Sequence, residues 1–186
     1  MLALKTKLPQ IRLILVILVM TVTLAGATYA LLATFTREVN NTFTIGDITL
    51  TLTDGGEDYR YLTPGRSIER TPRVTVAEGS EPCWLFVRLD KTAGFDEYLT
   101  FTVAEGWTRL GGYEGLYYRE VDARDGAASF GILAEDAVTV REDLTAERMS
   151  AVTAQPMLTF SAYAIQKQGI DEVGEAWIFI RLEVEE

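Results

Sequence analysis

Short segments in which apolar and polar residues alternate, separated by turn residues, run from residue 43 to the end of the chain. In FTIGDITLTLT at 43–53, Ile48, Leu50 and Leu52 fall on one face and threonines fall on the other. This period of two predicts a half-buried strand. The segment 83–89 is apolar on both faces, which predicts a central strand. Further strands are predicted at 73–77, 99–103, 116–121, 157–165 and 178–184. Strands at this spacing indicate an all-β fold, an antiparallel β-sandwich.

Turn signals and two short helices complete the predicted domain. The sequence DGG at 54–56 is expected to end the first strand as a turn. TPGR at 63–66 predicts another turn, because Pro presets φ and Gly tolerates a positive φ. One helix is predicted over 144–152 with Asp143 as its N-cap. A second is predicted over 170–177, with its apolar side chains toward the core. The sequence contains no repeat or linker that would divide residues 31–186 into two domains.

The N-terminal segment has the layout of a secretory signal. Lys5, Lys7 and Arg12 precede an uncharged run at 13–36, which reaches small residues in GATYA at 26–30. A positive start, an apolar centre and a small-residue exit are the three parts of such a signal. We therefore expect the rest of the chain to work outside the cytoplasmic membrane, secreted or at the cell surface.

The same segment also sets where the exported domain would begin. Thr28 at −3 and Ala30 at −1 fit the pocket of a signal peptidase, and Ala33 is a second possible −1 residue. Residues 1–30 are then the signal peptide, and 31–186 the mature domain. The alternative is an uncleaved anchor, since a transmembrane helix needs only about 20 apolar residues. The positive-inside rule places the C-terminal part outside in both cases.

The acidic net charge of the chain limits the classes of molecule that it is expected to bind. The formal net charge is −10, and the N-terminal signal carries basic residues but no acidic ones. The exported part is therefore more acidic than the whole chain. A nucleic-acid partner calls for a basic patch, so we expect no nucleic-acid binding and no docking on anionic lipid.

The scarcity of histidine and cysteine limits the catalytic sites, metal sites and disulfides that the chain can form. The chain has no histidine, which excludes Ser-His-Asp and Cys-His triads and His-ligated zinc sites. Cys83 is the only cysteine, so no intramolecular disulfide can form. In CWLFV at 83–87 it is expected to be a small buried residue; a reactive thiol or an intermolecular bridge are the alternatives.

Several motifs, in order along the chain, resemble one family. GATYA at 26–30 followed by NTFTIGDI at 41–48 resembles the opening of the TasA/camelysin family of Gram-positive bacteria. LTPG at 62–65 resembles a turn of that family, although Arg66 stands where an acidic residue is common. EGSEPCWLFV at 78–87, AYAIQ at 162–166 and EAW at 175–177 are similar to segments of uncharacterised clostridial members.

The resemblance implies an exported structural protein. It implies a jelly-roll-like β-sandwich, cleaved by a signal peptidase of the SipW type and placed at the cell surface or in a biofilm matrix. It also implies self-association into fibres, in which the N-terminal strand of one subunit completes the sheet of the next. The donor would be the segment 31–45, with Phe35, Val39, Phe43 and Ile45 as its apolar residues. The alternative is that this segment pairs within its own domain.

The sequence gives weaker support for an enzymatic or a metal-binding function. Camelysin carries a metalloprotease label, but a zinc hydrolase needs ligands that this chain lacks. We therefore expect no enzyme and no cofactor. Two carboxylates suffice for a glycosidase, yet no pair stands out. Acidic turns at 54–58 and 122–126 offer oxygen ligands for calcium but do not follow the EF-hand pattern.

Aromatic residues provide the remaining candidate site. Exposed aromatic side chains mark interaction patches, and a monomeric adhesion module for a glycan or surface protein is the runner-up function. Most of the aromatics are expected in the core, because adjacent residues of a strand point to opposite faces. The aromatics concerned are Trp84, Phe86, Trp107, Tyr113, Tyr117 and Tyr118.

Overall fold

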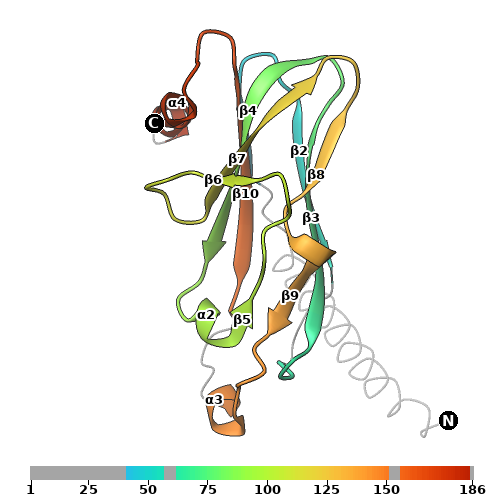
Figure 1. Cartoon of the computed structure of the whole chain (residues 1–186), viewed down its shortest axis with the longest axis vertical. Helices are drawn as coiled ribbons and strands as arrows, with labels where there is room; N and C mark the ends of the chain where they lie inside the picture. The colour runs from blue at the N-terminus through green and yellow to red at the C-terminus, as the bar shows by residue number, and fades with distance from the viewer. Residues whose placement is uncertain (1–40, 57–61, 151–155, 185–186) are drawn as a thin grey trace, which may run out of the picture. The chain divides into compact units, whose positions relative to one another are not determined.

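The computed structural model describes residues 41–56, 62–150 and 156–184, which form two β-sheets and a few helices (Figure 1). The first sheet has the order β1 (Asn41–Ile45), β10 (Leu158–Gln166), β4 (Ser80–Lys91), β7 (Leu116–Ala123) and β6 (Thr108–Arg109). The second has the order β2 (Leu50–Gly56), β3 (Ser67–Val76), β9 (Ala137–Val140) and β5 (Leu99–Thr100), and β8 (Ala128–Gly131) also pairs with β3. The helices are α2 (Phe95–Tyr98), η1 (Ala134–Asp136), α3 (Ala146–Ser150) and α4 (Val173–Val184).

The facing surfaces of the two sheets enclose one apolar core. Leu85 and Val87 of β4 are fully buried, and they belong to the same cluster as Val74 and Val76 of β3. Alternate residues of each strand therefore point into the space between the sheets, as the period of two requires. This is the arrangement of a β-sandwich, and the all-β fold class is confirmed at that level.

Strand β4 is the central strand that the sequence predicted. It is flanked by β10 on one side and by β7 on the other, both antiparallel. Its outward residues, Trp84 and Phe86, are buried beneath Trp177 and Ile180 of α4. Figure 1 shows α4 on the side of the first sheet that faces away from the second. The strand is apolar on both faces because the second sheet covers one face and α4 the other.

The prediction of a strand at 178–184 is wrong, because this segment belongs to helix α4. The buried side chains of α4 include Ala176, Trp177 and Ile180, at helical spacing. The segment IFIRLEV is apolar at alternate positions, so its period fits a strand as well. A short apolar run of this kind does not separate the two structures by periodicity, and no turn residue divides it from the helical pattern before it.

The segment 43–53 does not form one continuous strand. It divides between β1 and β2, which lie in different sheets. The division falls at Gly46, where φ is +100°, a conformation that favours glycine. The turn expected at 54–56 is also wrong, because Gly55 and Gly56 continue β2 and pair with Thr71 and Arg70.

Other predictions are confirmed in position with shifted bounds. The turn at 63–66 is closed by a hydrogen bond from Arg66 N to Thr63 O at 3.0 Å, with Gly65 at a φ of +74°. In the helix predicted at 144–152, α3 is capped by Thr145, whose hydroxyl accepts from Arg148 N at 3.3 Å. The N-cap is therefore not Asp143, which pairs with Arg141. Strands β6, β8 and β9 were not predicted; each has at most four residues.

No helix of the described residues combines the length and apolar character needed to cross a bilayer.

Candidate functional site

The candidate site is the edge of the first sheet formed by β1. This strand pairs with β10 in a parallel register over five residues, Asn41 opposite Ser161 through Ile45 opposite Ile165. All other strand pairings of the described residues are antiparallel. The expectation of a wholly antiparallel sandwich is therefore wrong at β1. Two parallel strands cannot be joined by a tight hairpin turn and need a crossover connection. Here the chain passes from β1 in the first sheet to β2 in the second sheet, and β10 follows much later in the chain.

Phe43 and Ile45 attach β1 to the domain through its outer face. Both side chains are half-buried, and they pack against the cluster that lies between the first sheet and α4. Their partners in the register are Tyr163 and Ile165 of β10. Thr44 points to the opposite face, where Ala164 is fully buried in the sandwich core.

The connection from β1 to β2 is tied down by several backbone hydrogen bonds. Ala77 N donates to Thr49 O at 2.9 Å, and Glu81 N donates to Asp47 O at 3.2 Å. The buried hydroxyl of Ser80 accepts from Thr49 N at 3.2 Å. Just before this anchored stretch lies Gly46, where any side chain would meet Gln166 at the end of β10. The backbone therefore changes direction at a position that only glycine fits without strain.

Aromatic rings form the surface against which β1 and α4 pack. The Trp177 ring lies with its centroid 5.4 Å from those of Phe86 and Tyr163 and 6.1 Å from that of Tyr113. Trp84 Nε1 donates to Ile170 O at 3.1 Å, which fixes the loop before α4. The Nε1 of Trp177 is buried and has no hydrogen-bond partner among the described residues.

Of the four apolar donor-strand residues expected from the sequence, the structure brings Phe43 and Ile45 together. Phe35 and Val39 lie outside the described residues, as do the signal residues Thr28 and Ala30 and the alternative Ala33. The donor assignment and the cleavage site therefore stay predictions.

The aromatic residues considered for adhesion are packed rather than exposed. Trp84 and Phe86 are buried beneath α4, and Tyr113 and Tyr118 belong to the same cluster. Trp107 is half-buried, and its Nε1 donates to Gly131 O at 2.8 Å. The large apolar side chains that are exposed among the described residues lie elsewhere, mainly on α4.

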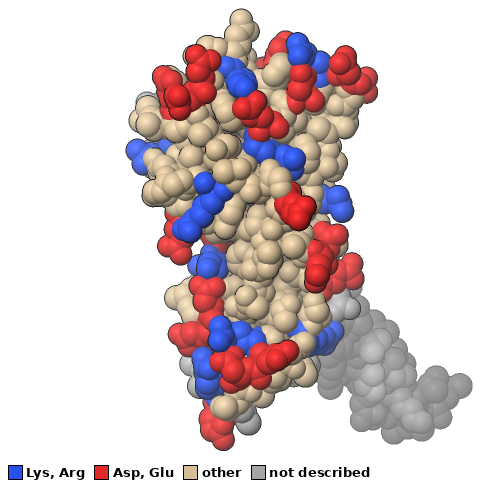
Figure 2. All heavy atoms as spheres, viewed as in Figure 1, with Lys and Arg blue, Asp and Glu red and all other residues tan. Residues whose placement is uncertain are grey.

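The first carboxylate of each acidic segment considered for calcium is paired with an arginine. Asp54 accepts from Arg70, and Asp122 accepts from Arg124 Nη2 at 2.6 Å. The hydrogen bonds from Arg124 lower the pKa of the Asp122 carboxyl. No group of three or more carboxylate or cysteine side chains suited to a metal ion occurs within the described ranges. On the face seen in Figure 2, acidic and basic side chains lie close together rather than in separate patches.

An open hollow of about 330 Å³ lies where β10 ends. The two basic side chains of its lining are paired: Lys167 Nζ donates to Glu120 Oε2 at 2.5 Å and lies 4.9 Å from the centre of the Trp84 ring, and Arg124 pairs with Asp122. Its other two charged side chains, Glu81 and Asp171, are carboxylates. The hollow therefore offers no unpaired cation to an anionic ligand. Its lining residues are Glu81, Pro82, Arg124, Gln166, Lys167, Gln168, Gly169 and Asp171.

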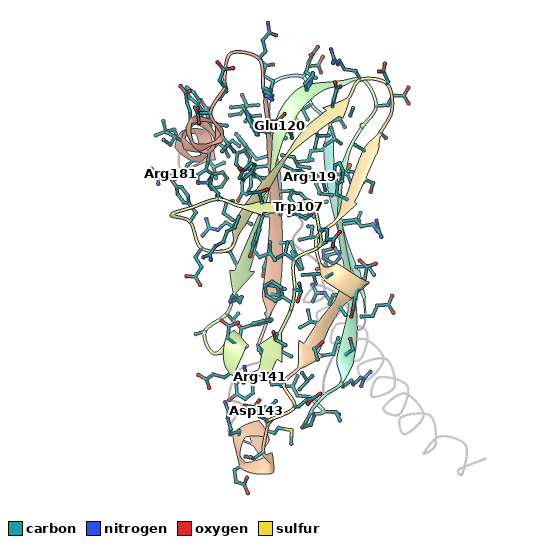
Figure 3. The ribbon with its side chains drawn as sticks, in the orientation of Figure 1. Trp107, Arg119, Glu120, Arg141, Asp143 and Arg181 are labelled. Atoms are coloured by element: carbon teal, nitrogen blue, oxygen red, sulfur yellow. The ribbon has the colours of Figure 1, made fainter. Side chains whose placement is uncertain are left out.

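A half-buried cation that the sequence did not reveal, Arg119, lies on β7. The guanidinium carbon of Arg119 lies 3.7 Å from the centre of the Phe130 ring and 5.2 Å from that of Trp107 (Figure 3). Burial lowers its pKa. Its Nε finds no hydrogen-bond partner among the residues described. The two rings therefore stabilise the charge by cation–π contact; β8, which brings Phe130 there, was too short to predict.

The comparisons with family models, curated proteins and solved structures found no match to the chain.

Proposed function

We propose that this chain is an exported structural protein of the cell surface or extracellular matrix, and that it self-associates into fibres by exchanging its N-terminal strand. The observation that carries the proposal is the position of β1. It is a five-residue edge strand, hydrogen-bonded to β10 alone among the described residues, and it is the first strand that the structure describes. The proposal includes a jelly-roll-like topology and no catalytic activity.

The contacts of β1 are of a kind that a second subunit can supply. Its parallel ladder satisfies the backbone groups of β10, and Phe43 and Ile45 fill the edge of the aromatic cluster. The same strand from a neighbouring chain would make the same contacts, which is the reason that domain swapping costs little. An uncovered β10 edge would in turn be a template for an incoming strand.

Gly46 is the position at which an exchanged strand would leave its own domain. The stretch after it is fixed by hydrogen bonds to the turn between β3 and β4. A change of backbone direction at Gly46 would therefore release β1 without disturbing β2. Because the donor and acceptor surfaces differ, the contact is head-to-tail, and it gives filaments when each subunit donates its strand to the next and the rotation between neighbours does not close a ring.

The sequence supports the proposed location of the protein and its proposed partners. The signal-like layout of residues 1–36 supports export, and the motifs that resemble the TasA/camelysin family support a surface or matrix role. The partners proposed are other copies of this chain and, during export, a signal peptidase. The strongly acidic composition fits a protein that must stay soluble until assembly.

A disulfide between two different chains tests the exchange. Thr44 and Ala164 are opposite each other in the β1–β10 register. Two single variants, Thr44→Cys and Ala164→Cys, are co-expressed with tags of different size and oxidised with diamide. We expect a mixed disulfide dimer, because β1 of one chain lies beside β10 of the other. The native Cys83 is buried and should stay unreactive.

Two controls make the result decisive. The double variant Thr44→Cys/Ala164→Cys shows whether the geometry allows the bond at all. A co-expression of Thr44→Cys with Ala127→Cys, which lies on an exposed turn, measures random collision. If the double variant forms only a bond within one chain and the co-expressed singles form none, strand exchange is refuted and β1 is an internal strand.

A further inference from the structure

Arg119 differs from the other half-buried cations because no carboxylate accompanies it. Among the described residues the half-buried basic side chains are Arg70, Arg119 and Lys167. Arg70 pairs with Asp54 and Lys167 pairs with Glu120, as expected for charges that are partly removed from water. Arg119 forms no ion pair in the described part of the chain, and its buried Nε has no hydrogen-bond partner there. A buried donor of this kind is rare in folded proteins and calls for an explanation.

The fold holds the guanidinium of Arg119 between the two sheets. Arg119 shares the inner face of β7 with Val121, which belongs to the core cluster, because residues two apart on a strand point the same way. Its side chain reaches Phe130 of β8, in the second sheet, at 3.7 Å from the ring centre. Trp107 is the second ring in contact (Figure 3), and its own hydrogen bond to Gly131 fixes it. The cation is therefore positioned before any ligand binds, which lowers the cost of binding.

The outer end of the guanidinium is accessible beside Gly106. A Cβ added at Gly106 would lie 3.1 Å from Nη2 of Arg119 and 3.5 Å from Nη1 and Cζ. The absence of a side chain therefore leaves room next to the two Nη groups. Unlike Nε, these two groups are not buried. Together they form a planar fork that matches the two oxygens of a carboxylate.

We propose that Arg119 anchors a binding site for a monocarboxylate that carries an apolar group. The carboxylate would accept hydrogen bonds from Nη1 and Nη2, as Asp54 and Glu120 accept them at the other two half-buried cations. The apolar group would rest on the exposed parts of the Trp107 and Phe130 rings, both of which are half-buried. A few polar groups among aromatic side chains are the usual lining of a small-molecule site.

The charge of the protein favours a ligand with a single negative charge. The formal net charge is −10, so the protein repels anions, and it repels multiply charged anions most strongly. One guanidinium neutralises one carboxylate but only part of a phosphate dianion. None of the residues of this site belongs to β1 or β10, so the proposed ligand site does not depend on strand exchange.

Nuclear magnetic resonance of the 15N-labelled full chain tests the site. The probe is sodium phenylacetate, with neutral phenylacetamide and sodium phosphate as comparisons at constant ionic strength. The signals followed are Arg119 Nε–H and Trp107 Nε1–H, which the variants Arg119→Lys and Trp107→Phe identify. We expect phenylacetate to shift both signals with saturation, phenylacetamide to shift neither, and phosphate to bind more weakly. Equal shifts with phenylacetate and phenylacetamide, a shift that does not saturate, or tighter binding of phosphate would overturn the proposal.

Two glycine variants form a matched pair for the accessible end of the guanidinium. Gly106 and Gly112 have φ values of +83° and +84°, so alanine strains the backbone equally at both. Only at Gly106 would the new Cβ meet Arg119, because nothing lies within 4 Å at Gly112. We expect Gly106→Ala to weaken phenylacetate binding at least about five-fold and Gly112→Ala to leave it unchanged. Equal affinities for the two folded variants would overturn the proposal.

A lysine variant tests the fork without removing the charge. Arg119→Lys keeps a cation but loses the planar pair of donors, so phenylacetate affinity, followed at Trp107 Nε1–H, should fall at least about five-fold. Arg109→Lys, at an exposed position of β6, is the control and should bind as the parent does. An unchanged affinity of Arg119→Lys would contradict the role of the fork, even if Gly106→Ala failed to fold.

Glu105 is the carboxylate nearest to Gly106 in the chain, and it forms no ion pair among the described residues. Glu105→Gln should therefore leave the Arg119 Nε–H signal of the ligand-free protein in place and should bind phenylacetate at least as tightly as the parent. A displaced ligand-free signal together with a tighter phenylacetate complex would show that Glu105 occupies the guanidinium in solution, and the site would not be vacant for a ligand.

Discussion

The ring of Trp177 on α4 lies 5.4 Å from the ring of Phe86 on β4, centroid to centroid, with 44° between the ring planes. This contact joins the C-terminal helix to the central strand of the first sheet. Both side chains are buried. The outer face of the sheet, and with it the surface on which Phe43 and Ile45 pack, therefore depends on α4.

Replacement of Trp177 should destabilise the whole domain. Trp177→Ala removes the ring that touches Phe86, Tyr163 and Tyr113, and such truncations of a buried aromatic cost about 3–5 kcal/mol. Phe179→Ala, on the exposed side of the same helix, is the matched control and should change stability by less than about 0.5 kcal/mol. Urea unfolding at low protein concentration measures both. Equal losses would contradict the packing of α4 described above.

Gly115 should not tolerate a side chain. Its φ is +68°, and a Cβ there would collide with the carbonyl oxygen of Leu89. Gly115→Ala should therefore cost at least about 2 kcal/mol, from the strained backbone and the displaced strand end. Gly79→Ala has a similar φ but open space, and Gly126→Ala lacks both constraints. Thermal unfolding should rank the losses in the order Gly115, Gly79, Gly126. A loss at Gly115 no larger than the loss at Gly79 would contradict the close approach of Gly115 to β4.

The Asp54–Arg70 pair should contribute to stability, unlike the exposed pairs. Arg70 Nε donates to Asp54 Oδ1 at 3.2 Å, and Nη2 of the same side chain donates to Oδ2. The two side chains are 19% and 10% exposed. Asp54→Ala leaves a largely buried guanidinium without its partner, so we expect a loss of about 2 kcal/mol in the free energy of unfolding.

The control for this prediction is Asp122→Ala, which breaks the exposed pair with Arg124. Exposed ion pairs contribute little, so no measurable change is expected. Chemical denaturation of both variants at the same ionic strength makes the comparison. Equal effects would mean that the burial of the Asp54–Arg70 pair does not matter.

Cys83 should make the domain less stable in alkali. Burial, with a further contribution from the charge of Asp122, raises the pKa of its thiol from 9.0 to about 11. The unfolded chain therefore releases this proton at lower pH than the folded chain, and stability should fall between pH 9 and pH 11. A shift of this size corresponds to about 2–3 kcal/mol.

Comparison with Cys83→Ala isolates this effect from other groups that titrate in the same range. The variant should lose less stability than the parent between pH 9 and pH 11, as measured by urea unfolding at several pH values. Parallel pH profiles for the two proteins would show that the buried thiol does not titrate in this way.

Alternation of apolar and polar residues predicted most of the strands, but it did not show which elements pack on their faces. The apolar run at 83–89 correctly predicted the central strand, because a strand buried on both faces has no polar side. The same reasoning failed at 178–184, where the apolar residues fit both an alternating strand pattern and a helical pattern. In the structure this segment is helical, and Ile180 packs in the cluster on the outer face of the first sheet. The sequence could not show that contact.

Local patterns also left the candidate site incomplete. Phe43 and Ile45 were predicted as apolar residues of the donor segment, but the sequence did not show their parallel pairing with β10, which joins residues more than a hundred positions apart. The apolar positions change from odd numbers at Phe43 and Ile45 to even numbers from Ile48 onward, and the chain changes sheets between them. Arg119 gave no signal, because its aromatic partners come from a loop and from the four-residue strand β8.

Electron microscopy with sedimentation of the protein from Leu31 onward tests the proposed function most directly. Samples over a range of concentrations, brought from neutral pH toward the sequence pI of about 4.6, reduce the like-charge repulsion that opposes assembly. The account predicts uniform filaments that become more abundant with concentration and with acidification. A strictly monomeric protein under all of these conditions would contradict it.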